Sequence, residues 1–226
     1  MKYEFILFDA DDTLFDFQQS AMQSLLAASR KFNIPDSLFN YELYHSINQK
    51  YWDLYSLGKV SKSDLLHFRF SDYLKQIGIE VNIDKMSRAY EETLSKTCIL
   101  FPETTDLLCS LRQRGLRLFL ITNGTAGVQR GRLSISGIEE YFEGVFISDE
   151  MGVAKPDKRF LGVVNSSISN FDKSKALIVG DSLLTDMTLG INCNIDTCFF
   201  NPKKQKATLP VSYEIRNFNE LLSIVK

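Results

Sequence analysis

The chain is poor in the side chains that build most metal and disulfide frameworks. Its 226 residues include two histidines and four cysteines, and no two cysteines stand in a C-x-x-C pair. This pattern indicates four reduced thiols rather than a disulfide framework. We therefore expect a cytoplasmic protein.

The sequence also lacks an excess of one charge and a long hydrophobic run. The formal net charge is −2, and no basic patch suggests a nucleic acid polymer as the main partner. The first apolar run, in MKYEFILFDADD, is only a few residues long before acids follow, so we expect neither a signal peptide nor a membrane span. Apolar residues make up 44% of the chain and charged residues 24%, which is typical of a soluble globular protein.

Short apolar runs rich in β-branched or aromatic residues recur along the chain and are typical of strands buried on both faces. They occupy residues 4–8, 116–121, 145–147, 176–179 and 197–200. Helical patterns lie at 103–114, at 157–168 and from about 217 onward, and Gly115 follows the first of them as a helix stop. The alternation predicts an α/β fold, with a parallel sheet covered by helices on both faces.

Residues 16–99 break this alternation. They contain no convincing strand and have the pattern of about four amphipathic helices. A direct crossover between parallel strands needs only about a dozen residues, so this stretch is too long for one. We predict a helical domain at 16–99, inserted after the first strand of a core formed by residues 1–15 and 100–226.

Polar residues follow the predicted strands. Asp9, Asp11 and Asp12 follow the first strand, Thr122-Asn123-Gly124 follows the second, and Gly180-Asp181-Ser182 follows the fourth, with Asp186 one turn later. Lys155-Pro156 precedes the helix that comes after the third strand. Because ligands of open parallel sheets bind at the carboxyl ends of the strands, we expect these residues to share one site.

The carboxylates of this set would repel one another if they shared one site. In an extended chain Asp9 and Asp11 face the same way, Asp12 points elsewhere, and Asp181 and Asp186 can approach from the fourth strand. Two like charges about 4 Å apart repel by ~4 kcal/mol at an effective dielectric near 20, so a cation is expected among them. Carboxylate oxygens without histidine suit Mg²⁺, which commonly shares its coordination with a substrate phosphate.

The remaining strand-end residues fit a phosphoryl group. Thr122, the backbone N–H groups of Asn123 and Gly124, and the ammonium of Lys155 can all bind phosphate oxygens. A carboxylate that attacks phosphorus forms an aspartyl-phosphate, and a second carboxylate can protonate the leaving oxygen and then activate water.

These patterns together resemble the haloacid dehalogenase-like (HAD) hydrolases. The matching stretches are D-x-D-x-T at 9–13, Thr-Asn-Gly at 122–124, Lys155-Pro156 and G-D-S-x-x-x-D at 180–186. The resemblance implies a Rossmann-like core with an α-helical cap of the C1 type inserted after the first strand. It implies that Asp9 is the nucleophile, that Asp11 is the general acid/base, and that Thr122 and Lys155 are phosphate ligands.

The resemblance also implies a metal site and a branch of the family. Asp9, the backbone carbonyl of Asp11, and Asp181 would hold Mg²⁺, with Asp186 bound directly or one shell out. Dehalogenase members lack the second acid, so the presence of Asp11 favours a phosphatase. FDADDTLF and GVAKPDKRF are most similar to the pyrimidine 5′-nucleotidase branch, which implies a nucleoside monophosphate substrate such as UMP.

In the predicted cap, we expect most aromatic residues to form its core. Tyr51 and Trp52 are candidates for stacking on a base, and Asn48 and Arg69 are polar candidates for contact with substrate. Asp149 and Glu150, after the third strand, are expected in a solvated loop, with a role near Lys155 as the alternative.

Two other functions remain open. One is a HAD phosphatase that acts on sugar phosphates or phosphoglycolate. The other is a signalling switch, because phosphorylatable receiver domains also combine acids, a hydroxyl residue and Lys-Pro around Mg²⁺. The placement of Asp11 argues against a switch, which has to preserve its acyl phosphate. We expect no membrane partner, and a monomer or a weak dimer.

Overall fold

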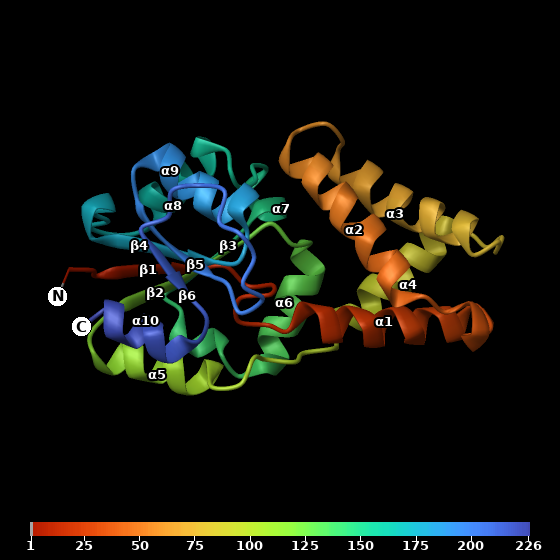
Figure 1. The fold of residues 1–226 in the computed structure, drawn as a ribbon, viewed down its shortest axis with the longest axis horizontal. Helices are drawn as coiled ribbons and strands as arrows, with labels where there is room; N and C mark the ends of the chain where they lie inside the picture. Colours follow the sequence, from red (N-terminus) through yellow and green to blue (C-terminus); the bar gives the residue numbers. More distant parts are fainter. Residues whose placement is uncertain (1) are drawn as a thin grey trace.

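The computed structural model describes residues 2–226. Its centre is a parallel sheet with the strand order β3-β2-β1-β4-β5-β6 (Figure 1). The strands are β1 (Phe5–Phe8), β2 (Arg117–Thr122), β3 (Gly144–Ile147), β4 (Ala176–Gly180), β5 (Asp196–Phe200) and β6 (Tyr213–Ile215). The first five confirm the predicted strands, and β6 is an edge strand that the sequence analysis did not predict.

Helices cover both faces of this sheet. They are α5 (Thr104–Gln113), α6 (Ala126–Ser136), α7 (Ser148–Met151), α8 (Lys158–Ser167), α9 (Thr188–Cys193) and α10 (Phe218–Ile224). Phe5 and Leu7 of β1 lie in a hydrophobic cluster with residues of α8 and α9, whereas Ile6 and Phe8 lie in another with residues of α5 and α10. Alternate residues of a strand face opposite sides, so the apolar run of β1 supplies both cores.

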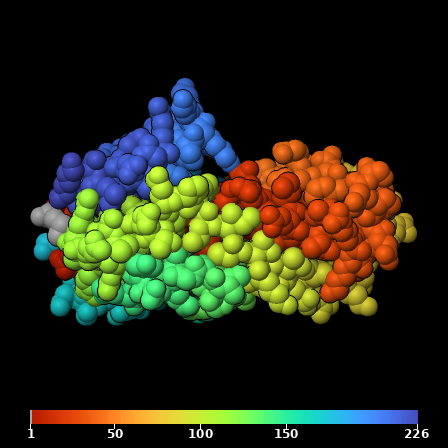
Figure 2. Space-filling model, turned by 90° about the horizontal axis from the view of Figure 1, so that it is seen from below, coloured from red at the N-terminus to blue at the C-terminus, as the bar shows by residue number. Residues whose placement is uncertain are grey.

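The chain between β1 and α5 forms four helices with a hydrophobic cluster of their own. They are α1 (Phe17–Lys31), α2 (Tyr41–Ser56), α3 (Lys62–Gln76) and α4 (Ile83–Leu94), which we call the cap. The buried members of this cluster lie in residues 21–94, together with Val128 of α6. Figures 1 and 2 show these helices, in red to yellow, at one end of an elongated molecule. The division of the chain at 16–99 stays a prediction.

The ends of the cap helices are specified by local sequence. Asn40 and Asn82 precede α2 and α4, and each side chain accepts a backbone N–H of the first turn. Ser61 and Asp64 form a reciprocal capping box at the start of α3. Gly78, at φ +70°, follows α3 in a conformation that costs glycine little.

All four cysteines are free. Within residues 2–226, none of the helices has both the length and the apolar character that a membrane crossing requires.

Candidate active site at the carboxyl edge of the sheet

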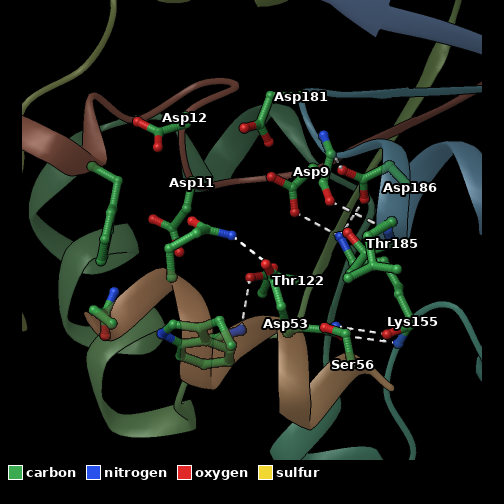
Figure 3. A pocket seen from close by; sticks show the side chains of 18 residues that line it. Asp9, Asp11, Asp12, Asp53, Ser56, Thr122, Lys155, Asp181, Thr185 and Asp186 are labelled. Atoms are coloured by element: carbon green, nitrogen blue, oxygen red, sulfur yellow. Dashed lines mark hydrogen bonds and ion pairs between the residues drawn. The ribbon is translucent and has the colours of Figure 1, made fainter. Parts of the chain in front are cut away.

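The carboxyl ends of β1, β2 and β4 open into a cavity of about 160 Å³ whose opposite wall is α2 of the cap (Figure 3). The acids that line it include Asp9, Asp11, Asp181 and Asp186. Thr122, Asn123, Gly124 and Lys155 line it as well. The structure thus brings together strand-end residues that are up to 177 positions apart in the sequence (9 to 186).

Lys155 lies between two of the acids. Its Nζ donates to Asp9 Oδ1 at 2.6 Å and to Asp186 Oδ1 at 2.6 Å. A third hydrogen bond, to the carbonyl oxygen of Ile121 at 2.9 Å, ties the same ammonium to β2. Lys155 is 1% exposed, so these charge-assisted bonds lie away from water and fix the direction of the Asp9 carboxylate.

Burial shifts the proton affinities of these groups. It raises the pKa of Asp9 to about 7, although the positive charge of Lys155 lowers it. Burial and the nearby charge of Asp9 raise the pKa of Asp181 well above its ordinary value. Burial alone would lower the pKa of Lys155, but the carboxylates of Asp186 and Asp9 outweigh it and the pKa is raised. The carboxylates of Asp9, Asp181 and Asp186 therefore carry more negative charge, when ionised, than the single ammonium of Lys155 can neutralise.

The arrangement of three acids fits a divalent cation. One oxygen each from Asp9, Asp181 and Asp186 lies within 4.8 Å of the other two. This donor set contains only hard carboxylate oxygens, which Mg²⁺ prefers over softer ligands. Lys155 offers one positive charge to three carboxylates, so a divalent cation also suits the charge of the site.

Asp186 is held firmly in this set. It lies in a single π-helical turn, Leu183–Met187, and its Oδ2 accepts the backbone N–H of Ser182 at 3.2 Å. Gly180 leaves the space that the carboxylate needs, because a Cβ at position 180 would overlap it. Asp186 is fully buried.

Asp11 has partners that the sequence analysis missed. Arg132 Nη1 forms an ion pair with its Oδ1, and Gln129 Nε2 donates to its Oδ2 at 2.9 Å. The same Nε2 donates to Thr122 Oγ1 at 2.7 Å. Gln129 also packs against Gly124, where a Cβ would come within 2.7 Å of its side chain. Residues of α6 thus connect Asp11 with Thr122.

The side chain of Asn123 and the backbone N–H of Gly124 both form hydrogen bonds within the protein. Asn123 Nδ2 donates to the carbonyl of Lys155 at 2.8 Å, and its Oδ1 accepts the Lys155 N–H at 2.9 Å. The Gly124 N–H donates to Thr122 Oγ1 at 3.1 Å. The side chain of Asn123 therefore fastens Lys155 to the end of β2.

The turn after β1 contains a third acid, Asp12, beside Asp9 and Asp11. Asp12, at φ +56°, also lines the cavity, so the expectation that it points elsewhere is wrong. The carboxylate that caps α1 belongs to Asp16, which accepts the backbone N–H of Gln19. Thr13 Oγ1 donates to Asp9 Oδ2 at 3.4 Å and so supports the turn.

Helix α2 presents one face to the cavity. Asn48 and Trp52 lie on that face, together with Gln49, Asp53 and Ser56, which the sequence analysis did not single out. The other two candidates are not among the lining residues: Tyr51 donates to Asp72 Oδ2 at 2.7 Å, and Arg69 Nη1 donates to Asn48 Oδ1 at 3.2 Å. A direct contact of Tyr51 or Arg69 with substrate stays a prediction that this arrangement does not support.

Lys62 of α3 links the cap to the core. Its Nζ donates to the carbonyl of Asn123 at 2.5 Å and lies 3.2 Å from Asp149 Oδ1. The same ammonium lies 4.5 Å from the ring centre of Trp52, a cation–π distance. Asp149 belongs to α7, with Glu150, so the prediction of a loop at these two residues is wrong. The helix follows β3 directly and aims Asp149 at Lys62.

Residues 6–200 match the family described as haloacid dehalogenase-like hydrolase. Pyrimidine 5′-nucleotidase PynA of Streptococcus pneumoniae is 34% identical over 224 residues, which cover 98% of this chain and 94% of that protein. Pyrimidine 5′-nucleotidase YjjG of Escherichia coli is 29% identical, and the match covers 98% of this chain and 97% of that protein.

A solved structure is similar over its whole length. The HAD-hydrolase YfnB of Bacillus subtilis, bound to magnesium and described as revealing interdomain movement, superposes with a TM-score of 0.92 at 32% identity. The superposition covers 100% of this chain and 99% of that one. Since the family match runs from β1 to β5 and includes the cap and the acids of the cavity, this chain belongs to the haloacid dehalogenase-like hydrolases.

Proposed function

We propose that this chain is a Mg²⁺-dependent phosphomonoesterase that acts on pyrimidine nucleoside 5′-monophosphates through an aspartyl-phosphate intermediate. One observation carries the proposal: a single cavity holds buried Asp9 against Lys155, with Asp11, Asp181 and Asp186 beside them. Membership of a hydrolase family supports turnover rather than a phosphorylated switch.

Asp9 is the proposed nucleophile. It is 7% exposed, and Lys155 holds one of its oxygens by a hydrogen bond of 2.6 Å. Attack by the carboxylate forms a bond from Asp9 oxygen to phosphorus while the bond from phosphorus to the ester oxygen breaks. This covalent route divides one difficult hydrolysis into two easier steps.

Asp11 is the proposed general acid/base. It donates a proton to the leaving ester oxygen in the first step. In the second step it takes a proton from the water that attacks phosphorus, and the bond from phosphorus to Asp9 breaks. Asp11 is protonated again at the end, so the cycle closes without another proton donor.

The phosphate ligands proposed are Thr122, Asn123, Gly124 and Lys155. The Thr122 hydroxyl and the Asn123 N–H lie at the end of β2, and Lys155 adds a positive charge. When bound, Mg²⁺ would neutralise phosphate charge, and Asp9, the carbonyl of Asp11, Asp181 and Asp186 are the residues that would hold it.

The proposed nucleoside contacts lie on α2. Trp52 and Asn48 line the cavity opposite the acids, and Gln49, Asp53 and Ser56 add polar groups to the same face. Stacking of a base on an aromatic ring is worth ~1–3 kcal/mol, enough to select among phosphate esters. The likeness to two nucleotidases supports this substrate class.

Sugar phosphates or phosphoglycolate form the second candidate class. A cavity of about 160 Å³ also suits an ester smaller than a nucleotide. A screen of phosphate release over nucleoside monophosphates and sugar phosphates, with Mg²⁺ present, separates the two classes. We expect UMP, dUMP or dTMP to give the highest kcat/KM. A sugar phosphate or phosphoglycolate that exceeds all nucleotides would support the second class.

The same screen tests the metal requirement. EDTA should stop phosphate release, and added Mg²⁺ should restore it, because the three acids need a cation beyond Lys155. Full activity in the chelator would exclude the metal-centred mechanism.

We also propose a cytoplasmic protein that is a monomer or a weak dimer. The four free cysteines support a reducing compartment. Light scattering on the purified protein measures its mass directly, and a stable higher oligomer would contradict this proposal.

A further inference from the structure

Arg132 is a buried arginine beside the active-site cavity. It is 0% exposed, and its guanidinium lies 4.3 Å from the ring centre of Phe15. Its Nη1 forms an ion pair with Asp11 Oδ1. Within residues 2–226, its Nε and Nη2 are buried without a hydrogen-bond partner, and Asp11 is the carboxylate at ion-pair distance.

Gln129 lies one turn before Arg132 on α6. Its Nε2 donates to Asp11 Oδ2 at 2.9 Å and to Thr122 Oγ1 at 2.7 Å, and its Oε1 accepts from Arg132 Nη1 at 3.3 Å. The two residues therefore hold both oxygens of the Asp11 carboxylate. Gln129 also fixes that carboxylate relative to Thr122.

A buried ion pair of this kind rarely increases stability. Removing a guanidinium from water costs several kcal/mol, and an apolar side chain of similar volume is often at least as stable. Here the acidic partner is not hidden with the arginine, because the Asp11 side chain is 28% exposed and lines the cavity. The pair therefore points to a role for Asp11 in the cavity.

We propose that Arg132 and Gln129 are positioning residues that hold the Asp11 carboxylate in place for both proton transfers. The inference rests on the proposed function, in which one carboxylate first protonates the leaving oxygen and then accepts a proton from water. Both transfers need the carboxylate at the same distance from phosphorus. Two donors from one helix can fix that position, whereas one rotatable side chain cannot.

The test compares two leaving groups. The p-nitrophenolate of p-nitrophenyl phosphate leaves without a proton, whereas the 5′-oxygen of UMP needs one. Because kcat/KM reports steps up to the first irreversible one, it isolates formation of the aspartyl-phosphate. For Arg132→Gln we expect kcat/KM for UMP to fall by about 100-fold or more, within the range of general acid catalysis. For p-nitrophenyl phosphate, kcat and KM should fall together, and kcat/KM should change by less than about tenfold.

Matched variants accompany this comparison. Arg132→Lys keeps the charge and should recover part of the loss on UMP. Arg130→Gln lies on the same helix and removes an exposed pair with Glu150, so it should leave both substrates unchanged. Gln129→Met keeps the packing volume but loses all three side-chain hydrogen bonds, and it should show the same selective loss. It supplies the test if Arg132→Gln does not fold.

Each outcome decides the question. Equal losses on the two substrates, in folded Arg132→Gln and Gln129→Met, would assign both residues a structural role and overturn the proposal. Unchanged or increased activity on UMP would overturn it as well. Failure of the wild-type protein to hydrolyse either ester would instead overturn the proposed function, which is a separate result.

Discussion

At the scale of single residues, the ammonium of Lys155 determines how Asp9 lies in the cavity. Lys155 holds Asp9 and Asp186 at 2.6 Å each, and because Lys155 is only 1% exposed, water weakens these charge interactions little. An asparagine in place of Asp9 keeps the size and one acceptor but cannot act as a carboxylate nucleophile.

Asp9→Asn should therefore abolish turnover of p-nitrophenyl phosphate and UMP while the protein stays folded. Circular dichroism checks the fold, and Asp157→Asn, at the cap of α8, serves as an active control. Phosphate release by Asp9→Asn at the wild-type rate would remove Asp9 from the nucleophile role.

The raised pKa of Asp9 predicts that Mg²⁺ stabilises the protein more at higher pH. Burial raises this pKa from 3.8 to about 7, so the folded protein binds a proton that the unfolded chain releases. In protein stripped of divalent ions, this carboxyl's contribution to stability is complete below pH 4 and is lost as the pH rises to 7. Mg²⁺ competes with that proton for the carboxylate. Below the pKa of Asp9, the affinity for Mg²⁺ therefore falls about tenfold for each unit by which the pH decreases, because one proton is displaced on binding.

Thermal unfolding in EDTA and in Mg²⁺ measures this effect without any assay of activity. The increase in the unfolding midpoint caused by Mg²⁺ should be larger at pH 8 than at pH 5.5. Asp9→Asn should reduce the difference, and the remainder comes from Asp181, whose pKa burial also raises. An increase that is the same at both pH values would contradict the assignment of Asp9 to the metal site.

At the scale of secondary-structure elements, α3 and α7 meet through Lys62. Lys62→Met keeps most of the apolar stem of the side chain but removes its bonds to the carbonyl of Asn123 and to Asp149. Hydrogen bonds to charged groups contribute about 1.5–3 kcal/mol, so we expect the free energy of unfolding to fall by about 1–3 kcal/mol.

Urea unfolding at equilibrium measures that change. Lys75→Met, an exposed position on the same helix, is the matched control and should change stability by less than about 0.5 kcal/mol. Equal stability of the two variants would mean that the contact between α3 and the core contributes nothing to the fold.

The elements differ in how far the sequence alone predicts them. The strands β1 to β5 and their terminal acids were predictable, because apolar runs mark buried strands and parallel strands end at one edge. The strand β6 was missed because Tyr213–Ile215 is three residues long and only Ile215 is fully buried. The site residues Asp9, Asp181 and Asp186 follow strands, and so their convergence could be expected.

Gln129 and Arg132 could not be found in the same way. They lie on the helix α6, and which of its faces meets the cavity depends on packing that the sequence pattern does not reveal. Gln49, Asp53 and Ser56 were missed for the same reason on α2. Tyr51 of the same helix donates to Asp72 and does not line the cavity, and its contact with substrate stays a prediction. The cap's helices were predictable from periodicity, but not their orientation over the sheet.

At the scale of the whole molecule, the cap covers the cavity with the face of α2 that contains Asp53 and Ser56 (Figure 3). Trp52 also lines the cavity from this helix. Trp52→Ala should lower kcat/KM for UMP and dUMP more than it lowers kcat/KM for ribose 5-phosphate and p-nitrophenyl phosphate. The physical reason is that stacking on a base contributes ~1–3 kcal/mol, and p-nitrophenyl phosphate has no base.

Steady-state kinetics on these four esters measures the selectivity. Tyr55→Phe, a neighbour of Trp52 with a ring contact at 5.9 Å, controls for small changes in cap packing. Equal losses on all four substrates would assign Trp52 to the cap core instead of the substrate site.

The central claim is that Asp9 takes a phosphoryl group in a site that depends on a divalent cation. The most direct measurement is the intact mass of Asp11→Asn protein, quenched in acid during reaction with p-nitrophenyl phosphate and Mg²⁺. This variant lacks the base for the second step, so the adduct should accumulate. We predict the mass of one added phosphoryl group, located on Asp9, and no such mass in EDTA or in Asp9→Asn. Release of p-nitrophenol at the wild-type rate from protein that never gains that mass would contradict the account.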